Sequence, residues 1–390
     1  MTQEQIYHNI AQRTGGDIYL GVVGPVRSGK STFIKRFAEL MLLPRIKNEA
    51  RRARAHDELP QSAAGRTIMT TEPKFIPEKA VKIDLSGGGS FKARLIDCVG
   101  YMVDGALGHE ENEAPRLVKS PWFDHEVPFD LAAETGTRCV IREHATIGLV
   151  VTTDGSVADL PREAYLDAER RIIAELNDSG KPYVILLNCA EPDSDDARRL
   201  ATELAERYAH AVVPLNCTTM TVETLDSLLQ TLLYEFPIRE IAVRMPGWVT
   251  MLESGHWLQS AIYTAMLEFA ASVHKMADLA GRRPQLGCEY ITSASLTGMD
   301  LASGSVGINA VVAPDIFYKI LGEQTGLDIV DEASLLPCVV SLARAKRAYD
   351  KIKSALDQVE ATGYGIVMPG IDELTLEEPE IVRQGGQYGV

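Results

Sequence analysis

Gly24-Pro25-Val26-Arg27-Ser28-Gly29-Lys30-Ser31 decides the fold, because it fits the phosphate-loop pattern G-x-x-x-x-G-K-[ST] at every fixed position. Residues 17–23 before it form the apolar run of a buried strand. Residues 32–43 after it repeat apolar side chains at helical spacing. A strand, a glycine-rich loop and a helix in this order form a phosphate-binding unit. We therefore predict a phosphate loop rather than a glycine turn with a stray lysine.

Each residue type in this loop has a chemical role. Glycines let the backbone wrap the phosphates, and the helix N-terminus directs free N–H groups at them. The Lys30 ammonium would reach the β- and γ-phosphates, and the Ser31 hydroxyl would hold Mg²⁺. The residues that we expect to bind the nucleotide here are Gly24, Arg27, Ser28, Gly29, Lys30, Ser31 and Thr32.

Length and composition are those of a globular protein. The 390 residues are enough for two or three domains, and 45% hydrophobic with 24% charged residues is an ordinary balance. We expect no transmembrane segment and no secretion, since the chain lacks an apolar run of about 18 residues and a signal-peptide pattern. A formal net charge of -15 argues against general nucleic-acid binding.

Two further patterns narrow the class of site. The basic run at residues 51–54 is better explained as a solvated helix face than as a phosphate contact. The six cysteines have no C-x-x-C spacing, so we expect reduced cytoplasmic thiols and neither a zinc site nor a disulfide framework. They are Cys98, Cys139, Cys189, Cys217, Cys288 and Cys338.

Strand-like and helix-like segments alternate from residue 17 to about 236, which predicts an α/β fold with a mostly parallel sheet covered on both faces. One hairpin would make a single antiparallel pairing, and residues 98–128 look irregular. The expected strands are 17–23, 80–85, 91–96, 147–151, 183–188 and 212–215, and the expected helices are 32–43, 162–178, 194–208 and 222–235.

The pattern changes at about residue 237, where we predict a smaller α+β domain over 237–390 after a P-loop domain over 1–236. Its expected elements are a helix over 253–279, strands over 290–301 and 306–312, and a helix over 334–360. The last helix carries an apolar stripe, which favours a core face over a partner site. Residues 363–390 show no closing helix.

A second motif follows the predicted hairpin. Asp97-Cys98-Val99-Gly100 places an acid at the tip of an apolar strand, where it can hold Mg²⁺ through water. Gly100 can donate its N–H to the γ-phosphate. The alternative is a structural loop aspartate.

The loop at residues 65–73 supplies candidate switch residues. A threonine between the first helix and the hairpin can complete Mg²⁺ coordination and sense the γ-phosphate. We choose Thr70 and Thr71, with Thr67 less favoured and an ordinary polar loop as the alternative. The predicted catalytic set is therefore Lys30, Thr70, Thr71 and Asp97, and the predicted metal ligands are Ser31, Thr70 and Asp97.

The order of these motifs is that of translation-factor-like GTPases, but the guanine reader is altered. Asn188-Cys189-Ala190-Glu191 stands where N-K-x-D is expected, so the base-covering lysine is replaced and the carboxylate is longer. Losing paired hydrogen bonds to guanine removes most discrimination, which favours ATP over GTP. Asn188 stays a nucleotide-binding candidate. Because Tyr101 replaces a water-orienting glutamine after Gly100, we expect slow hydrolysis.

The loops between these motifs resemble the stage IV sporulation protein A family of spore-coat morphogenetic ATPases. The resemblance covers essentially the whole chain and is strongest from 13 to 100. It rests on the stretches 13–24 (RTGGDIYLGVVG), 57–65 (DELPQSAAG), 67–75 (TIMTTEPKF), 144–148 (HATIG), 152–155 (TTDG) and 378–385 (EPEIVRQG).

The resemblance implies ATP hydrolysis with Mg²⁺ and self-assembly into a static polymer, the basement layer of the spore coat. It implies as partners other copies of the chain, other coat morphogenetic proteins and a small membrane-bound amphipathic anchor peptide. The location would be the mother-cell cytoplasm at the forespore surface. Members of the family carry a further C-terminal docking region, and we expect this sequence to end before it.

Two other functions remain open. A regulatory P-loop GTPase with relaxed base specificity would bind guanine nucleotides tightly. A small-molecule kinase would need a catalytic base, for which residues 100–150 offer only His109, His125 and His144. Each of these is more commonly a surface or packed histidine.

Overall fold

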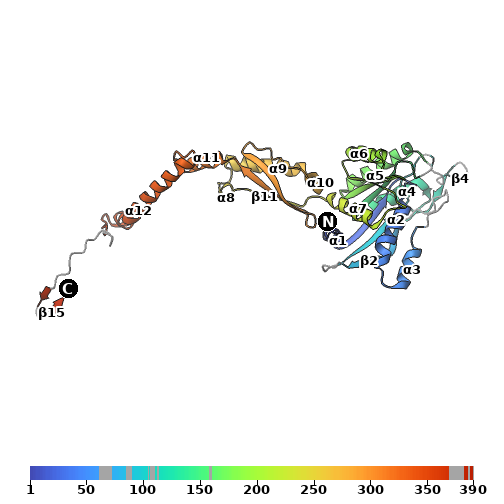
Figure 1. Ribbon diagram of the computed structural model, residues 1–390, viewed down its shortest axis with the longest axis horizontal. Coiled ribbons are helices and arrows are strands. Elements are labelled where there is room, and N and C mark those ends of the chain that lie inside the picture. The colour runs from blue at the N-terminus through green and yellow to red at the C-terminus, as the bar shows by residue number, and fades with distance from the viewer. Residues whose placement is uncertain are drawn as a thin grey trace. The chain divides into compact units, whose positions relative to one another are not determined.

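A six-stranded sheet in the order β10-β9-β8-β1-β3-β2 forms the centre of the N-terminal part of the computed structural model (Figure 1). All neighbouring pairs are parallel except β2 and β3, which are antiparallel, as the hairpin predicts. The mixed α/β fold with a mostly parallel sheet is confirmed. The strands are β1 (Asp17–Val23), β2 (Lys74–Asp84), β3 (Ser90–Asp97), β8 (Ile147–Thr153), β9 (Tyr183–Asn188) and β10 (Val212–Leu215).

The structure describes residues 1–60, 73–84, 90–103, 105, 110–111, 114–157, 160–368, 382–384 and 387–389. The chain divides into two compact units, Met1–Val311 and Val312–Val390. No helix in the described part is both long and apolar enough to cross a membrane.

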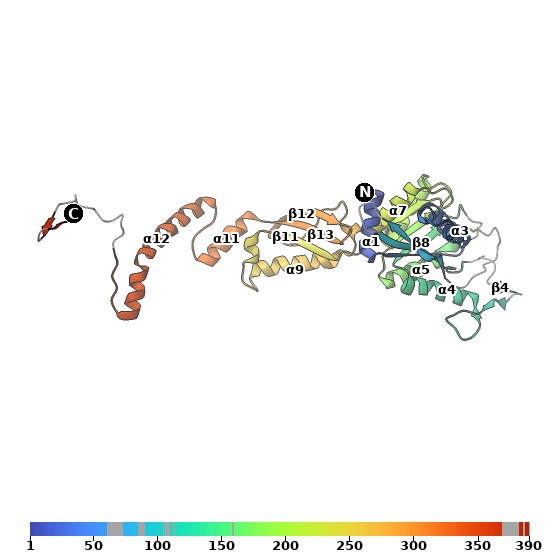
Figure 2. The ribbon, with the colours of Figure 1, turned by 90° about the horizontal axis from the view of Figure 1, so that it is seen from below.

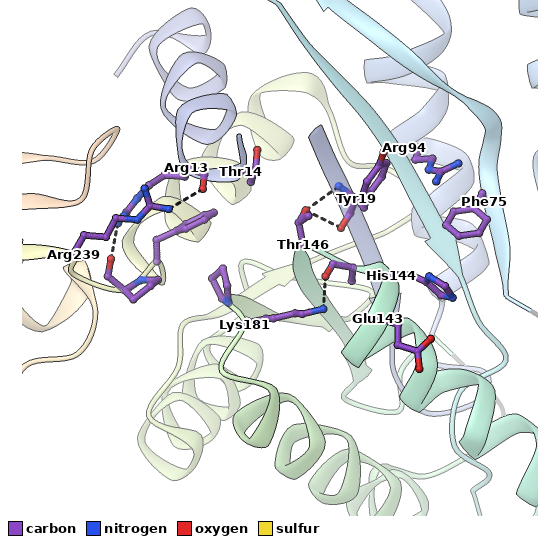
Figure 3. A pocket seen from close by; sticks show the side chains of 14 residues that line it. Arg13, Thr14, Tyr19, Phe75, Arg94, Glu143, His144, Thr146, Lys181 and Arg239 are labelled. Atoms are coloured by element: carbon purple, nitrogen blue, oxygen red, sulfur yellow. Dashed lines mark hydrogen bonds between the residues drawn. The ribbon is translucent and has the colours of Figure 1, made fainter. Parts of the chain in front are cut away.

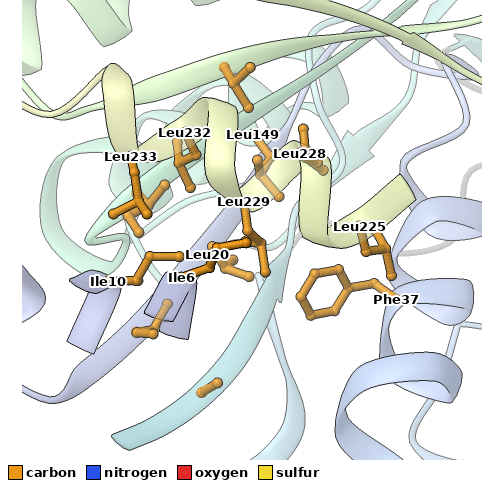
Figure 4. Close-up of a cluster of buried hydrophobic side chains, with 14 of the residues drawn as sticks. Ile6, Ile10, Leu20, Phe37, Leu149, Leu225, Leu228, Leu229, Leu232 and Leu233 are labelled. Atoms are coloured by element: carbon orange, nitrogen blue, oxygen red, sulfur yellow. The ribbon is translucent and has the colours of Figure 1, made fainter. Parts of the chain in front are cut away.

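Helices cover both faces of the sheet, because successive strand residues point to opposite sides. Leu20 and Leu149 pack with leucines of α7 and with α1 and α2 on one face (Figure 4). Val150 and Ile185 pack on the other face with α5 and with Val140 and Ile141, which directly follow α4. The helices are α1 (Gln3–Thr14), α2 (Lys30–Phe37), α4 (Phe129–Cys139), α5 (Leu166–Ser179), α6 (Asp195–Tyr208) and α7 (Val222–Tyr234).

The helices α1, α3 (Glu49–Asp57) and α4 are absent from the sequence prediction. The helix α3 buries only Ala55, so its charged sequence carries no apolar stripe. Its basic run 51–54 is exposed, as predicted. The helix α1 was not predicted, and α4 buries mainly small residues. After α2 the chain continues as a π-helical turn (Ala38–Leu42) and a 3₁₀ turn (Leu43–Arg45).

The remaining short elements flank α4 and α5. Two-residue strands pair within the segment that was predicted to be irregular. They are β4 (Glu110–Glu111) with β5 (Ala114–Pro115), and β6 (Leu117–Val118) with β7 (Val127–Pro128). A π-helical turn (Val140–His144) extends α4, and a 3₁₀ turn (Arg162–Tyr165) precedes α5.

A second sheet of three strands, in the order β11-β13-β12, lies beside α9 (Figure 2). Val306 and Ile308 of β13 join the same buried cluster as α1 and α7. The single helix predicted over 253–279 is wrong, because residues 273–275 interrupt it. The elements are β11 (Glu240–Arg244), α8 (Gly247–Thr250), α9 (Trp257–Ser272), α10 (Met276–Leu279), β12 (Ile291–Asp300) and β13 (Ser305–Val312).

The unit Val312–Val390 contains α11 (Pro314–Thr325), α12 (Glu332–Thr362), β14 (Val382–Gln384) and β15 (Gln387–Gly389). The apolar stripe of α12 is exposed: Val339 and Leu342 each keep 51% of their surface accessible, and Tyr349 keeps 50%. Ala355 is the buried residue of this helix. The interpretation of the stripe as a core face is therefore wrong for the described structure, since no described element covers it.

Candidate nucleotide-binding site

The phosphate loop lies at the carboxyl edge of the parallel strands. The strand β1 ends at Val23, the loop turns through Gly24–Gly29, and α2 begins at Lys30. Gly24 has a φ of 153°, and a Cβ there would overlap the Val151 carbonyl of β8. The strand-loop-helix unit predicted from the sequence is therefore present, and its first glycine is required by close backbone approach.

Lys30 lies buried against the loop that it follows, with 5% of its surface exposed. Its Nζ donates to the carbonyl oxygens of Gly24 at 3.1 Å and Pro25 at 2.7 Å. Burial lowers the pKa of Lys30, while Cys98 and Asp97 act in the opposite direction. The ammonium is thus held over the loop, where a phosphate would meet it.

Asp97 ends β3 and lies beside the loop, since β3 pairs with β1 in a register that sets Asp97 opposite Val22. Its Oδ1 is buried without a hydrogen-bond partner. Burial raises the pKa of Asp97 to about 6, and the positive charges of Lys30 and Lys74 oppose this rise. A buried carboxylate oxygen without a partner is a group that a hydrated Mg²⁺ would satisfy.

Gly100 brings the Asp97–Gly100 segment onto the phosphate loop. Its φ is 91°, and a Cβ there would lie 2.6 Å from Lys30 Nζ and would overlap the Gly24 carbonyl oxygen. Next to it, the carbonyl of Tyr101 accepts from Val26 N at 2.9 Å. The two motifs predicted to act together are therefore in contact.

Asn188 connects the phosphate loop to a third loop. Its Nδ2 donates to the Ser28 carbonyl at 3.0 Å, and its Oδ1 accepts from Cys217 N at 3.1 Å. The side chain lies so close to Gly29 that a Cβ there would overlap the Asn188 amide. Asn188 thus fixes the position of the phosphate loop.

The other predicted residues fall into two groups. Arg27 has a positive φ of 65°, the Ser28 hydroxyl is buried without a partner, and Ser31 and Thr32 are partly exposed at the start of α2. Thr67, Thr70 and Thr71 lie outside the described residues, so the switch-loop prediction stays a prediction.

The predicted metal site is described only through Ser31 and Asp97. Among the residues that the structure places, no group of three His, Cys, Asp or Glu side chains could hold an ion by itself. The predicted Mg²⁺ site fits this arrangement, because Mg²⁺ usually keeps several waters and takes further ligands from phosphates.

The sequence analysis did not identify Cys217, Ser156 or Arg162 as residues that support this edge of the sheet. Cys217 follows β10, and the position after a parallel strand could have marked it. The Ser156 hydroxyl accepts from Ala190 N at 2.9 Å, which joins the loops after β8 and β9. Behind them, Arg162 pairs with the fully buried Glu169 at 2.6 Å.

Replacing Asn188 with alanine should weaken ATP binding about tenfold and lower the free energy of unfolding by about 1–3 kcal/mol, because buried Ser28 and Cys217 backbone groups lose their partner. Calorimetric titration with ATP and denaturant unfolding measure the two effects. Asn9→Ala on α1 is the control and should change neither. Unchanged affinity in Asn188→Ala would contradict the assigned role.

Comparison with known proteins gives matches along the whole chain. One family model, described as "Stage IV sporulation protein A, ATPase domain", matches residues 1–237, and a second, "Stage IV sporulation protein A, middle domain", matches residues 238–390. Stage IV sporulation protein A of Bacillus subtilis (strain 168) is 45% identical over 392 residues, which cover 100% of this chain and 80% of that protein. The protein of the same name from Clostridioides difficile (strain 630) is 44% identical over 386 residues, with 99% and 79% covered.

Proposed function

This chain belongs to the stage IV sporulation protein A family, and we propose that it binds ATP with Mg²⁺ and hydrolyses it to drive assembly of a static polymer. The observation that carries the proposal is the meeting of Lys30, Asp97 and Gly100 at one edge of the sheet. These groups come from separate segments and meet where parallel α/β sheets bind nucleotides.

The residues present fit ATP and Mg²⁺. Lys30 and the backbone N–H groups of the loop would hold the β- and γ-phosphates, and Gly100 N–H would contact the γ-phosphate. Ser31, Thr70 and Asp97 would hold the ion, Asp97 through water. When bound, Mg²⁺ neutralises charge that develops on the phosphate oxygens during transfer.

The strand order of the six-stranded sheet supports our proposal that this domain is related to translation-factor-like GTPases. The order β10-β9-β8-β1-β3-β2, with only β2 antiparallel, places the Asp97 motif beside the phosphate loop and the Asn188 motif two strands away on the other side. Thr70 and Thr71 would act as the γ-phosphate sensors of such a domain. Hydrolysis should be slow, because the position after Gly100 holds a buried tyrosine, Tyr101, in place of a glutamine that would orient the attacking water.

The base-reading segment supports ATP over GTP. Cys189, which replaces the base-covering lysine, is fully buried, and its N–H donates to the Leu215 carbonyl at 3.0 Å. Because this thiol is buried, it cannot pack against a base with an aliphatic chain or place a positive charge beside it, as a lysine would. A competition assay decides: GTP displacing ATP at equal concentration would favour the regulatory GTPase instead.

A small-molecule kinase receives less support. His144 packs edge-on against Phe75 at 5.5 Å, at the strand edge opposite the phosphate loop, and His125 contacts Phe123 at 6.2 Å. His109 lies outside the described residues. Transfer of phosphate to a metabolite pool, rather than release of inorganic phosphate, would revive this function.

The proposed output is the basement layer of the spore coat, in the mother-cell cytoplasm at the forespore surface. The partners would be further copies of the chain, other coat morphogenetic proteins and a small membrane-bound amphipathic anchor peptide. We propose domains over 1–236 and 237–390, the second serving assembly contacts, and the meeting of the two family models at 237 and 238 supports this division.

Sedimentation tests the assembly step. A version as long as the relatives, incubated with Mg·ATP, should form pelletable polymers, and its Lys30→Ala variant should stay in the supernatant. If both proteins behave alike, the link between ATP hydrolysis and assembly fails.

A further inference from the structure

A cavity lies at the strand edge opposite the phosphate loop (Figure 3). Its volume is about 660 Å³. Thr146 and Pro182 line it where β8 and β9 begin, whereas the nucleotide site lies where these strands end. The segment 236–239, which leads into β11, forms another wall. The ATP site proposed above therefore makes no use of this cavity.

Four cations line the cavity: Arg13, Arg94, Lys181 and Arg239. We call it the basic pocket. Glu143 is the one carboxylate in its described lining, so the wall carries an excess of positive charge in a chain whose formal net charge is -15. A concentration of one charge sign in a hollow attracts ligands of the opposite sign.

Carbonyl oxygens and aromatic rings, rather than carboxylates, hold these cations in place. Lys181 Nζ donates to the Arg142 carbonyl at 2.8 Å and the Ala145 carbonyl at 2.6 Å. The guanidinium of Arg94 lies 4.0 Å from the centre of the Phe75 ring and 4.6 Å from that of Tyr19.

Hydrogen bonds link the segments that carry Arg13 and Arg239. Arg13 Nη2 donates to the Pro237 carbonyl at 2.8 Å, and Arg239 Nη2 donates to the Arg13 carbonyl at 3.3 Å. Asp300 attracts Arg13 from a distance. In the part of the chain that the structure describes, none of the four cations forms an ion pair, so their charges are positioned but not neutralised.

Two of the guanidinium groups keep buried donors without a partner. Arg13 is 5% exposed, and its Nε and Nη1 lack a hydrogen-bond acceptor, as does Nε of Arg94. Repulsion from Arg239 adds to burial in lowering the pKa of Arg13 to about 10. Buried donors without acceptors are uncommon in folded proteins and indicate that an acceptor is missing.

The pocket also offers apolar surface. Tyr19, Phe75 and Phe236 line it between the cations, and its volume falls within the ordinary range for small-molecule sites. We propose that the basic pocket binds a small organic anion that carries two or more carboxylate or phosphate groups on a flat apolar body. Such a ligand would bridge Arg94 on the first sheet to Arg239 before β11 and hold the two segments together.

Calorimetric titration of the whole chain with benzene-1,3,5-tricarboxylate tests this, because the probe contains no phosphate. Arg94→Gln and Arg239→Gln should each weaken binding at least about fivefold, since each removes a charge-assisted contact. Arg199→Gln on α6, an exposed arginine 2.8 Å from Asp196, makes the same change in net charge and should bind as wild type. Because Arg239 is exposed, its variant keeps the test valid if Arg94→Gln fails to fold.

The same titration separates the basic pocket from the phosphate loop. Lys30→Ala should bind the tricarboxylate as wild type does, and the probe should raise the unfolding temperature of both proteins. Absence of binding to wild type, or equal weakening by Arg199→Gln, would overturn the proposal. So would loss of binding in Lys30→Ala with retention in Arg239→Gln, since that places the anion at the phosphate loop. With Lys30→Ala as the ATP-site control, failure of this proposal leaves the ATPase proposal standing.

Discussion

Replacing Lys30 with alanine is expected to weaken ATP binding by about ten- to a hundredfold and to slow hydrolysis by about a hundredfold or more. The ammonium would make charge-assisted hydrogen bonds to the β- and γ-phosphates, each worth about 1.5–3 kcal/mol. Its position between the Gly24 and Pro25 carbonyls directs it there without a large movement. Calorimetric titration with ATP and a phosphate-release assay measure the two effects.

The matched control is Lys35→Ala on the same helix, α2. Lys35 lies further along the helix and is only partly buried, so its replacement removes the same charge without changing a contact to the phosphate loop. The control should bind and hydrolyse ATP as wild type does. If the two variants lose activity equally, the effect belongs to charge or helix stability and not to a phosphate contact.

Replacing Asp97 with asparagine should slow ATP hydrolysis by about a hundredfold or more while stabilising the nucleotide-free protein. Loss of hydrolysis follows because an amide holds a hydrated Mg²⁺ much less well than a carboxylate does. The gain in stability follows because the wild-type carboxylate is buried and its Oδ1 has no hydrogen-bond partner. Opposite changes in activity and stability would mark Asp97 as a functional residue rather than a loop aspartate.

The stability gain of Asp97→Asn should depend on pH. The folded-state pKa of Asp97 is raised from 3.8 to about 6, so the folded protein binds this proton more tightly than the unfolded chain does. Wild type therefore loses stability relative to the variant as pH rises from about 4 to about 6, and the difference stays constant above that. At pH 7.5 we expect the variant to be more stable by about 1–3 kcal/mol. Thermal unfolding at several pH values measures this, and a difference that shrinks as pH rises would contradict it.

The phosphate-loop unit was predictable because its signal is local. β1, β9 and β10 have the predicted bounds, since each is a short apolar run between polar turns. The positions of Asp97 and Asn188 near the phosphate loop were predictable because each ends such a run and parallel strands end at a common edge.

What the sequence could not predict depends on long-range contacts. The sequence pattern indicates a base contact for Asn188, whereas its bonds to the Ser28 carbonyl and Cys217 N hold the phosphate loop in place. The basic pocket joins residues more than 200 positions apart, such as Arg13 and Arg239, and no local pattern marks them. The stripe of α12 has the spacing of a core face, yet spacing alone does not say whether another element covers it.

Release of inorganic phosphate, measured side by side from Mg·ATP and Mg·GTP on wild type and Asp97→Asn, tests the central claim most directly. We predict slow hydrolysis of ATP by wild type, weaker hydrolysis of GTP, and loss of both in the variant. Faster release from GTP than from ATP, or an ATP rate unchanged by Asp97→Asn, would contradict the claim that this site hydrolyses ATP.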